Sequence, residues 1–81
     1  MMDHLLEAVY DEYTLATGLH GKFHSAHEGY AVILEELEEL KAEVFKKSGD
    51  RNIARMRKEA IQVAAMALRF ITDVIPLEVK E

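Results

Sequence analysis

A stripe of apolar residues in the C-terminal third of the chain constrains the fold more than any other feature. Its members follow one another at alternating steps of three and four residues: Ile53, Met56, Ala60, Val63, Ala67, Phe70 and Val74. This spacing lines one face of an α-helix, which we expect to end before Pro76 because a proline ring does not fit a helix interior. An apolar helical face is stable in water only when it packs on another apolar face. The stripe therefore predicts a helical bundle.

Two earlier segments supply the partner helices. One covers about residues 3–17 and is closed by "TGLHG". The other covers about residues 26–47 and opens with "SAHE", which has the form of a capping box. The short connection around Gly49 makes the second and third helices antiparallel neighbours. The predicted fold is all-α, with three helices, a central antiparallel αα-hairpin and a single domain over residues 1–81.

The apolar arcs of the second and third helices are wider than one chain can bury. They extend beyond the stripe to further side chains: Leu34, Phe45, Ala64, Leu68 and Ile71. A chain of 81 residues also has little surface to bury in a core of its own. We therefore expect a homodimer or homotetramer in which hairpins from two copies complete a four-helix bundle.

Charge and composition argue against several classes of protein. A formal net charge of −5 disfavours binding to a nucleic-acid polymer, because such surfaces need an excess of Lys and Arg. The N-terminal "MMDHLLEAVYDEY" carries acids where a signal peptide has basic residues, and no apolar run approaches the ~20 residues of a membrane span. The chain has no cysteine, which suits a reducing compartment. We expect a soluble cytoplasmic protein that does not contact a membrane.

Acidic side chains flank the apolar line on both hairpin helices. "LEELEELKAE", residues 34–43, has glutamate at five of its ten positions, and one more glutamate lies in the third helix. At about 100° per residue, four side chains lie roughly 60° to 120° to the same rotational side of their helices: Glu36, Glu39, Glu59 and Gln62. Antiparallel pairing about Gly49 brings these flanks together at one level, because position 49 is the midpoint of both crossing pairs. The sequence therefore predicts a ring of three carboxylates and one amide.

A ring of this kind favours a bound cation. Clustered carboxylates repel one another and lose hydration beside an apolar seam, and a divalent ion offsets both effects. Carboxylate and amide oxygens on facing helices suit a hard ion such as Mg²⁺ or Mn²⁺, which keeps coordination positions for water and phosphate. The expected cofactor is therefore Mg²⁺ or Mn²⁺, bound beside a phosphate-bearing substrate.

The same residues give the chain a resemblance to a known family. "EELEE", residues 35–39, fits the E-E-x-x-E motif of the MazG-like all-α nucleotide pyrophosphohydrolases. "EAIQ", residues 59–62, lies where the second motif of that family, E-x-x-D, follows. The resemblance covers about residues 23–75. It implies Mg²⁺-dependent hydrolysis of a (d)NTP to the monophosphate and pyrophosphate, in helical bundles built by dimers or tetramers.

The resemblance also implies roles for individual side chains. Three glutamates would be metal ligands: Glu36, Glu39 and Glu59. Glu35 would position or deprotonate the attacking water. Gln62 departs from the family pattern, which has Asp there; its amide oxygen can still coordinate, but the site loses one negative charge. Arg55 lies near Glu59 on the same flank, and we expect it to pair with that carboxylate or with a phosphate.

Other interpretations of these residues stay open. The glutamates also fit a solvated helix face that pairs with residues such as Lys41. Gln62 and the small size also fit a catalytically decayed helical module that acts as an interaction protein. A third interpretation is a sensor that binds a metal or a nucleotide without hydrolysing it.

Several charged residues have simpler expected roles. A zinc site is disfavoured for the three histidines around the first loop, which we expect to point away from the ring: His20, His24 and His27. We expect Glu43 to be solvated, although it lies on the flank of the ring. Arg69 and Asp73 are expected to form an exposed pair on the third helix.

Overall fold

The structure is a computed structural model, and it describes residues 1–79. In chain order its elements are α1 (Met2–His20), α2 (Ala26–Val44), the 3-10 turn η1 (Ser48–Asp50), α3 (Ile53–Arg69), the π-helical segment η2 (Phe70–Val74) and α4 (Ile75–Glu78). No strand occurs within the described residues, and three long helices pack against one another. The predicted all-α class is therefore confirmed.

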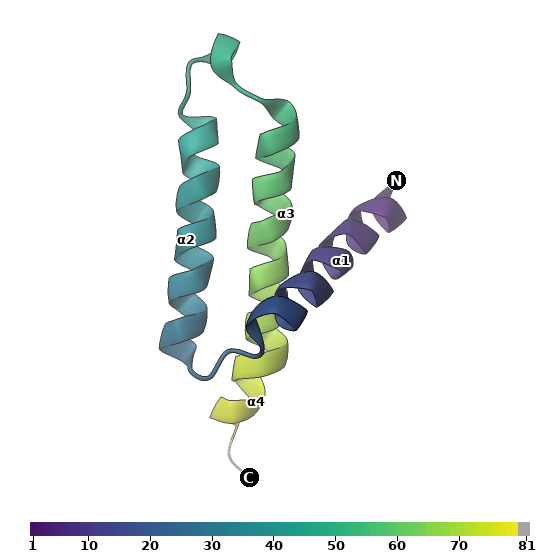
Figure 1. The fold of residues 1–81 in the computed structure, drawn as a ribbon, viewed down its shortest axis with the longest axis vertical. Helices are drawn as coiled ribbons and strands as arrows, with labels where there is room; N and C mark the ends of the chain where they lie inside the picture. The colour runs from purple at the N-terminus through teal and green to yellow at the C-terminus, as the bar shows by residue number, and fades with distance from the viewer. Residues whose placement is uncertain (80–81) are drawn as a thin grey trace.

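The predicted hairpin is formed by α2 and α3, which run antiparallel and pack along their length (Figure 1). α1 crosses α3 obliquely and packs on it (Figure 1). Within residues 1–79, α1 makes no comparable contact with α2. α3 is therefore the central helix, which packs on both α1 and α2.

α1 is longer than the predicted range because the chain turns at Gly21 and not within "TGLH". The φ angle of Gly21 is 74°, in the left-handed region that favours glycine. Its N–H donates to the Thr17 carbonyl at 2.8 Å and closes the helix. Gly18, the earlier of the two glycines, stays inside α1.

α2 starts at the predicted cap, Ser25, although the Glu28 carboxylate bonds to the residue before the cap and not to the cap's own N–H as in a capping box. The Glu28 N–H donates to Ser25 Oγ at 3.1 Å, and the Glu28 carboxylate accepts from the His24 N–H at 2.8 Å. α2 ends at Val44, earlier than the expected end near residue 47. The guanidinium of Arg51 explains this end, because its Nε donates to the Val44 carbonyl at 2.9 Å and satisfies one of the last helical carbonyls.

The prediction that the third helix ends before Pro76 is wrong. The helical path changes register instead: the Ile75 N–H bonds to the Phe70 carbonyl five residues back, which forms the π-helical η2. Pro76 then lies in the first turn of α4, where the missing N–H is not needed. The C-terminal helical stretch thus continues to Glu78.

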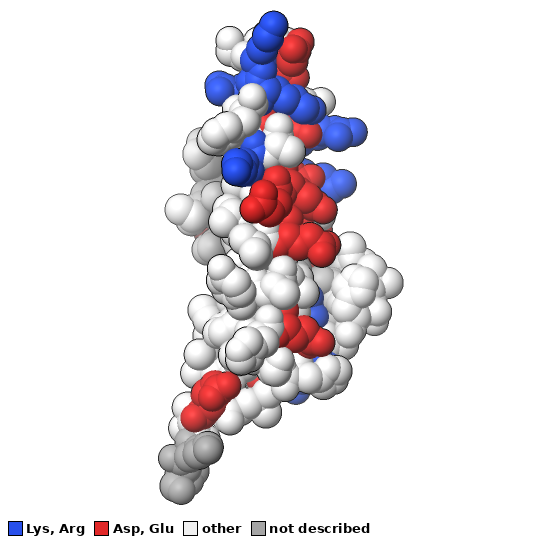
Figure 2. Space-filling model, turned by 90° about the vertical axis from the view of Figure 1, so that its left-hand side faces the viewer, with Lys and Arg blue, Asp and Glu red and all other residues white. Residues whose placement is uncertain are grey.

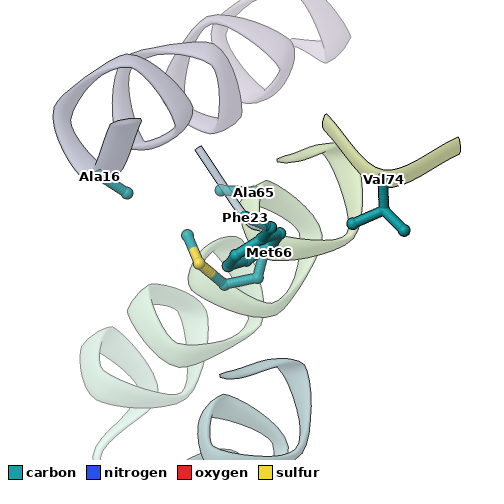
Figure 3. Packing of buried hydrophobic residues seen from close by; sticks show 5 residues of the cluster. All are labelled: Ala16, Phe23, Ala65, Met66 and Val74. Carbon is teal, nitrogen blue, oxygen red and sulfur yellow. The ribbon is translucent and has the colours of Figure 1, made fainter. Parts of the chain in front are cut away.

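The buried core lies where α1 and the α1–α2 loop meet α3 and η2; Figure 3 shows its five residues from close by. It consists of Ala16, Phe23, Ala65, Met66 and Val74. Phe70 packs against this cluster from η2, and it approaches Gly29 of α2 so closely that an added Cβ would lie 2.7 Å from its ring. The absence of a side chain at Gly29 therefore allows α2 and η2 to meet.

Two charged residues of the C-terminal stretch lie inside this core, so the prediction of an exposed Arg69–Asp73 pair is wrong. Arg69 is 2% exposed and Asp73 is 8% exposed. Arg69 lies over the Phe23 ring at 4.1 Å from its centroid and donates to the Gly21 carbonyl at 2.6 Å. Asp73 Oδ2 accepts from the Phe23 N–H at 3.1 Å. Both side chains hold the α1–α2 loop on the C-terminal stretch.

The outer side of the hairpin carries uncovered apolar side chains. On α2 they lie on the rotational side opposite the glutamates, and together with those of α3 and η2 they are Tyr30, Leu34, Leu37, Phe45, Ile53 and Ile71. The molecule exposes 6109 Å², whereas a compact monomer of its mass of 9.2 kDa would expose about 4900 Å². Its Cα radius of gyration is 14.1 Å, against about 12 Å for a compact chain of this length. The described chain therefore leaves apolar surface uncovered.

The C-terminal stretch also bears on the expectation that no run is long enough for a membrane span. The continuous helical path Ile53–Glu78 passes a test of length and mean hydropathy for crossing a membrane, with 28% of its most apolar window buried. The core helix of a soluble protein can pass the same test. The two buried charges of this path bond to the α1–α2 loop, which favours packing within a protein.

Candidate metal centre

Three glutamates meet between α2 and α3. Glu36 and Glu39 lie one helical turn apart on α2, and Glu59 faces them from α3. One carboxylate oxygen from each lies within 4.8 Å of the others. The structure therefore brings together the three carboxylates that the sequence placed in one ring.

The local sequence explains why they converge. A spacing of three residues puts Glu36 and Glu39 on one flank of α2. The antiparallel hairpin then sets Glu59 opposite them, with the turn at Ser48–Asp50 near the midpoint of the two segments. Acidic side chains form a patch below a basic hairpin tip, and an uncharged surface lies beside the patch (Figure 2).

The cluster is not an ordinary solvated acidic face. Glu36 and Glu59 are half-buried, and Glu39 is exposed. One oxygen of Glu36, Oε2, and one of Glu59, also Oε2, are inaccessible to solvent and have no hydrogen-bond partner. A buried carboxylate oxygen without a donor is costly, so these two atoms call for a cation or a proton.

The pKa values of the two half-buried glutamates also reflect the cost of burying a carboxylate beside other carboxylates. Burial, followed by the charge of Glu39 and the hydrogen bond that a protonated Glu36 would form with it, raises the pKa of Glu36 from 4.5 to about 7, and Glu59 and Glu35 add to the effect. Burial and the same neighbour, Glu39, also raise the pKa of Glu59, which Lys58 partly offsets. Without a cation, the cluster therefore retains protons at pH values where isolated glutamates are ionised.

Gln62 contacts a residue that was not predicted from the sequence to lie near the site. Its amide Nε2 donates to Glu12 Oε1 of α1 at 3.2 Å. Gln62 lines a cavity together with Glu36. Within residues 1–79 no hydrogen bond joins its amide to the three glutamates, so its place in the ring stays a prediction. No sequence signal identified Glu12, because the angle at which α1 crosses α3 does not follow from helical periodicity.

The cavity has a volume of about 560 Å³ and lies between α1, α2 and α3. Glu35 and Lys58 line it together with Glu36. Its apolar wall is made by Leu15, Ala16, Leu19, Phe23, Val32 and Met66. The volume is in the range of small-ligand sites. Of the three clustered glutamates, Glu36 lines this cavity, and Glu39 and Glu59 lie outside its lining.

Two neighbouring charges have partners that the sequence did not predict. Arg55 Nη1 lies 3.8 Å from Glu43 Oε2 and not beside Glu59, and its pairing with a phosphate stays a prediction. Glu43 is not solvated: it is 7% exposed, and Lys46 Nζ donates to both of its oxygens at 3.1 Å. Glu43 is therefore neutralised by two cations, in contrast to Glu36 and Glu59.

The comparisons with known proteins add nothing to this geometry. No family model, curated protein or solved structure matches the chain. The functional argument therefore depends on the carboxylates, their burial and the cavity beside them.

Proposed function

We propose that this protein is a metal-dependent nucleotide pyrophosphohydrolase that converts a (d)NTP to the monophosphate and pyrophosphate. The observation that carries the proposal is the convergence of Glu36, Glu39 and Glu59, with ligand oxygens within 4.8 Å and two buried oxygens without a partner. The E-E-x-x-E resemblance supports the same reaction class. The adjoining cavity supplies room for the substrate.

Mg²⁺ or Mn²⁺ fits the residues present. Glu36, Glu39 and Glu59 would hold it, because the oxygens of Glu36 and Glu59 that lack a donor are the atoms a cation would satisfy. When bound, the ion supplies charge neutralisation for phosphate oxygens. Hard oxygen ligands without sulfur or nitrogen favour these ions over zinc.

The remaining side chains of the cavity have roles that follow from their position. Glu35 lies on the cavity wall and would orient a water molecule for attack on phosphorus and accept its proton, while the bond to the pyrophosphate oxygen breaks. Lys58 would pair with a phosphate. The apolar wall around Phe23 would receive the base and sugar.

The proposal includes a homodimer built through the outer side of the hairpin. The excess of exposed surface over a compact monomer is on the order of 1200 Å², and a stable interface needs about 800 Å² from each partner. The uncovered side chains of α2 are on the flank opposite the glutamates, so a second hairpin can pack there without covering the cluster. Two such hairpins make a four-helix bundle.

A turnover screen tests the activity. Each common ribo- and deoxyribonucleoside triphosphate would be incubated with Mg²⁺ or Mn²⁺, and pyrophosphate release would be measured. We expect turnover of at least one nucleotide, and loss of that turnover in Glu39→Gln and Glu35→Gln. Glu38→Gln is the matched control, because Glu38 is an exposed glutamate of the same helix outside the cluster. No turnover with the full panel and both ions would contradict an enzyme.

A second candidate function is a module that binds a nucleotide and a metal without hydrolysing the nucleotide. Gln62 favours it, because an amide replaces the carboxylate that the resembling family uses there. Calorimetry with Mg²⁺ and a non-hydrolysable nucleotide analogue distinguishes the two functions. Binding without turnover supports the module that binds a nucleotide and a metal. The absence of both binding and turnover supports an interaction module.

A further inference from the structure

The contact between Glu12 of α1 and Gln62 of α3 assigns a role to a residue outside the motifs. We propose that Glu12 is a positioning residue that turns the amide oxygen of Gln62 toward the carboxylate cluster, so that Gln62 serves as a neutral fourth ligand of the cation. This inference rests on the proposed metal site. It concerns how α1, which does not otherwise contribute a ligand, takes part in that site.

The chemistry of the contact fixes the orientation of the amide. A carboxylate oxygen accepts hydrogen bonds and an amide nitrogen donates them, so the group that Gln62 presents to Glu12 is its NH₂. The observed bond from Gln62 Nε2 to Glu12 Oε1, at 3.2 Å, has this sense. The carbonyl oxygen of the amide is therefore turned away from Glu12. Without a neighbouring charge, the two ends of the amide would be nearly equivalent in shape.

The position of Gln62 on α3 suits its amide oxygen to serve as a ligand of the cation. Gln62 follows Glu59 by one helical turn on the same flank of α3, and it lines the same cavity as Glu36. The cluster contains two buried carboxylate oxygens that lack a partner, one on Glu36 and one on Glu59. An amide oxygen facing them would repel them unless a cation lies between, and with a cation it becomes a further hard ligand.

Packing holds Glu12 in place for this role. Glu12 is half-buried, and the residue next to it in α1, Tyr13, bonds to Thr72 of η2 through its hydroxyl at 3.1 Å. Ala16, one turn further along α1, lies in the buried core. Val9, which precedes Glu12 in α1, packs against the same core, so α1 is held in place on both sides of Glu12. Groups that orient metal ligands in this way typically change metal affinity by about 10- to 100-fold.

The test measures Mg²⁺ and Mn²⁺ binding by calorimetry and follows the side-chain carbonyl carbon of Gln62 by nuclear magnetic resonance. In the wild type, we expect that carbon to shift on addition of Mg²⁺. Glu12→Leu should weaken binding about 10-fold or more and abolish the shift. Tyr13→Phe is the control for α1 docking, because it removes another polar contact of the same helix; its metal affinity should stay within about twofold.

A paired exchange separates orientation from loss of charge. In the double variant Glu12→Gln/Gln62→Glu, the hydrogen bond between positions 12 and 62 is kept. The amide on α1 is now its donor, and the carboxylate on α3 is its acceptor and lies where it can bind the cation. We expect this variant to bind Mn²⁺ at least as tightly as the wild type. Gln62→Glu alone places two carboxylates, at positions 12 and 62, opposite each other. We expect their repulsion to lower the melting temperature of the protein in the absence of metal.

The outcomes distinguish this inference from the proposed function. Metal binding by the wild type, with equal affinity in folded Glu12→Leu and no shift of the Gln62 carbon, would overturn the inference and leave the three-glutamate site standing. A wild type that binds neither ion would overturn both. A paired variant weaker than Glu12→Leu would also contradict the positioning role.

Discussion

The carboxylate of Asp73 accepts a hydrogen bond from the backbone N–H of Phe23, at 3.1 Å and across 50 residues of chain. This bond attaches the α1–α2 loop to η2, and the buried Arg69 adds a second attachment through the Gly21 carbonyl. The loop forms one wall of the cavity beside the glutamates. The two buried charges therefore connect the stability of the fold to the shape of the site.

Loss of this attachment should destabilise the protein. Asp73→Ala leaves the buried N–H of Phe23 without an acceptor, and we expect it to lower the free energy of unfolding by about 1–3 kcal/mol. Glu78→Ala, which removes an exposed acid from the same C-terminal stretch, should change it by less than about 0.5 kcal/mol. Urea denaturation measures both values. Equal stability of the two variants would contradict the role given to Asp73.

Two glycine substitutions should have opposite effects. A Cβ at Gly29 would lie 2.7 Å from Cδ2 of Phe70, so Gly29→Ala should destabilise the fold by about 1–3 kcal/mol through overpacking. Gly18 lies inside α1 with nothing within 4 Å of an added Cβ, so Gly18→Ala should stabilise it by about 0.5–1 kcal/mol. Thermal and urea unfolding of the pair would test the close approach of α2 to η2. A neutral Gly29→Ala would argue against that approach.

Stability without a divalent ion should depend on pH through Glu36. Its pKa is about 7 in the folded protein, above its ordinary value of 4.5, so the folded state holds this proton more tightly than the unfolded state. The resulting stabilisation is complete below pH 4.5, declines as pH rises and is lost above about pH 7. Melting temperatures in a chelator, from pH 4.5 to 8, should fall less steeply for Glu36→Gln than for the wild type.

The raised pKa of Glu36 also predicts how metal affinity depends on pH. Divalent ions need the ionised form of the cluster, so Mn²⁺ should bind more tightly as pH rises toward 8 and should release protons on binding. Added Mn²⁺ should raise the melting temperature of the wild type at pH 8 and leave that of Glu36→Gln nearly unchanged. Parallel pH profiles of the two proteins in chelator would contradict the assignment to Glu36.

The outer side of the hairpin should hold a second copy of the chain. Ile71 is 60% exposed on that side, and Ile71→Lys should convert a dimer to a monomer because a lysine would be buried without a partner. Leu6 of α1 is 59% exposed and lies outside the hairpin, so Leu6→Lys should leave the dimer intact. Sedimentation at micromolar concentration measures the outcome. A monomeric wild type, or one that partitions onto lipid vesicles, would contradict the dimer.

Helical periodicity predicted the hairpin and the meeting of the glutamates, because both depend on spacing within α2 and α3 and on one short turn. It did not predict the position of Glu12, since the crossing angle of α1 is set by side-chain packing around Ala16 and Phe23. It also misplaced Arg69 and Asp73, because their partners are backbone groups of a loop. Helical periodicity predicts a charge on a helix flank to be exposed, and it does not include a distant segment that covers this charge.

For a related reason, helical periodicity does not predict that the helical path continues through Pro76. A proline is compatible with a continuing helical path when the preceding turn changes register, and the π-helical bond from the Ile75 N–H to the Phe70 carbonyl provides that change. Phe70 and Val74 of this segment pack on the core, and that packing stabilises the wider turn. Local sequence rules do not include such tertiary contacts.

Calorimetric titration with Mn²⁺ at pH 8 tests the central claim most directly, by comparing the wild type with Glu39→Gln, Glu59→Gln and Glu38→Gln. The structure predicts binding by the wild type and by Glu38→Gln, and a loss of at least about 10-fold in affinity for each of the other two variants. No binding by the wild type, or equal affinity in all four proteins, would contradict a metal site at Glu36, Glu39 and Glu59.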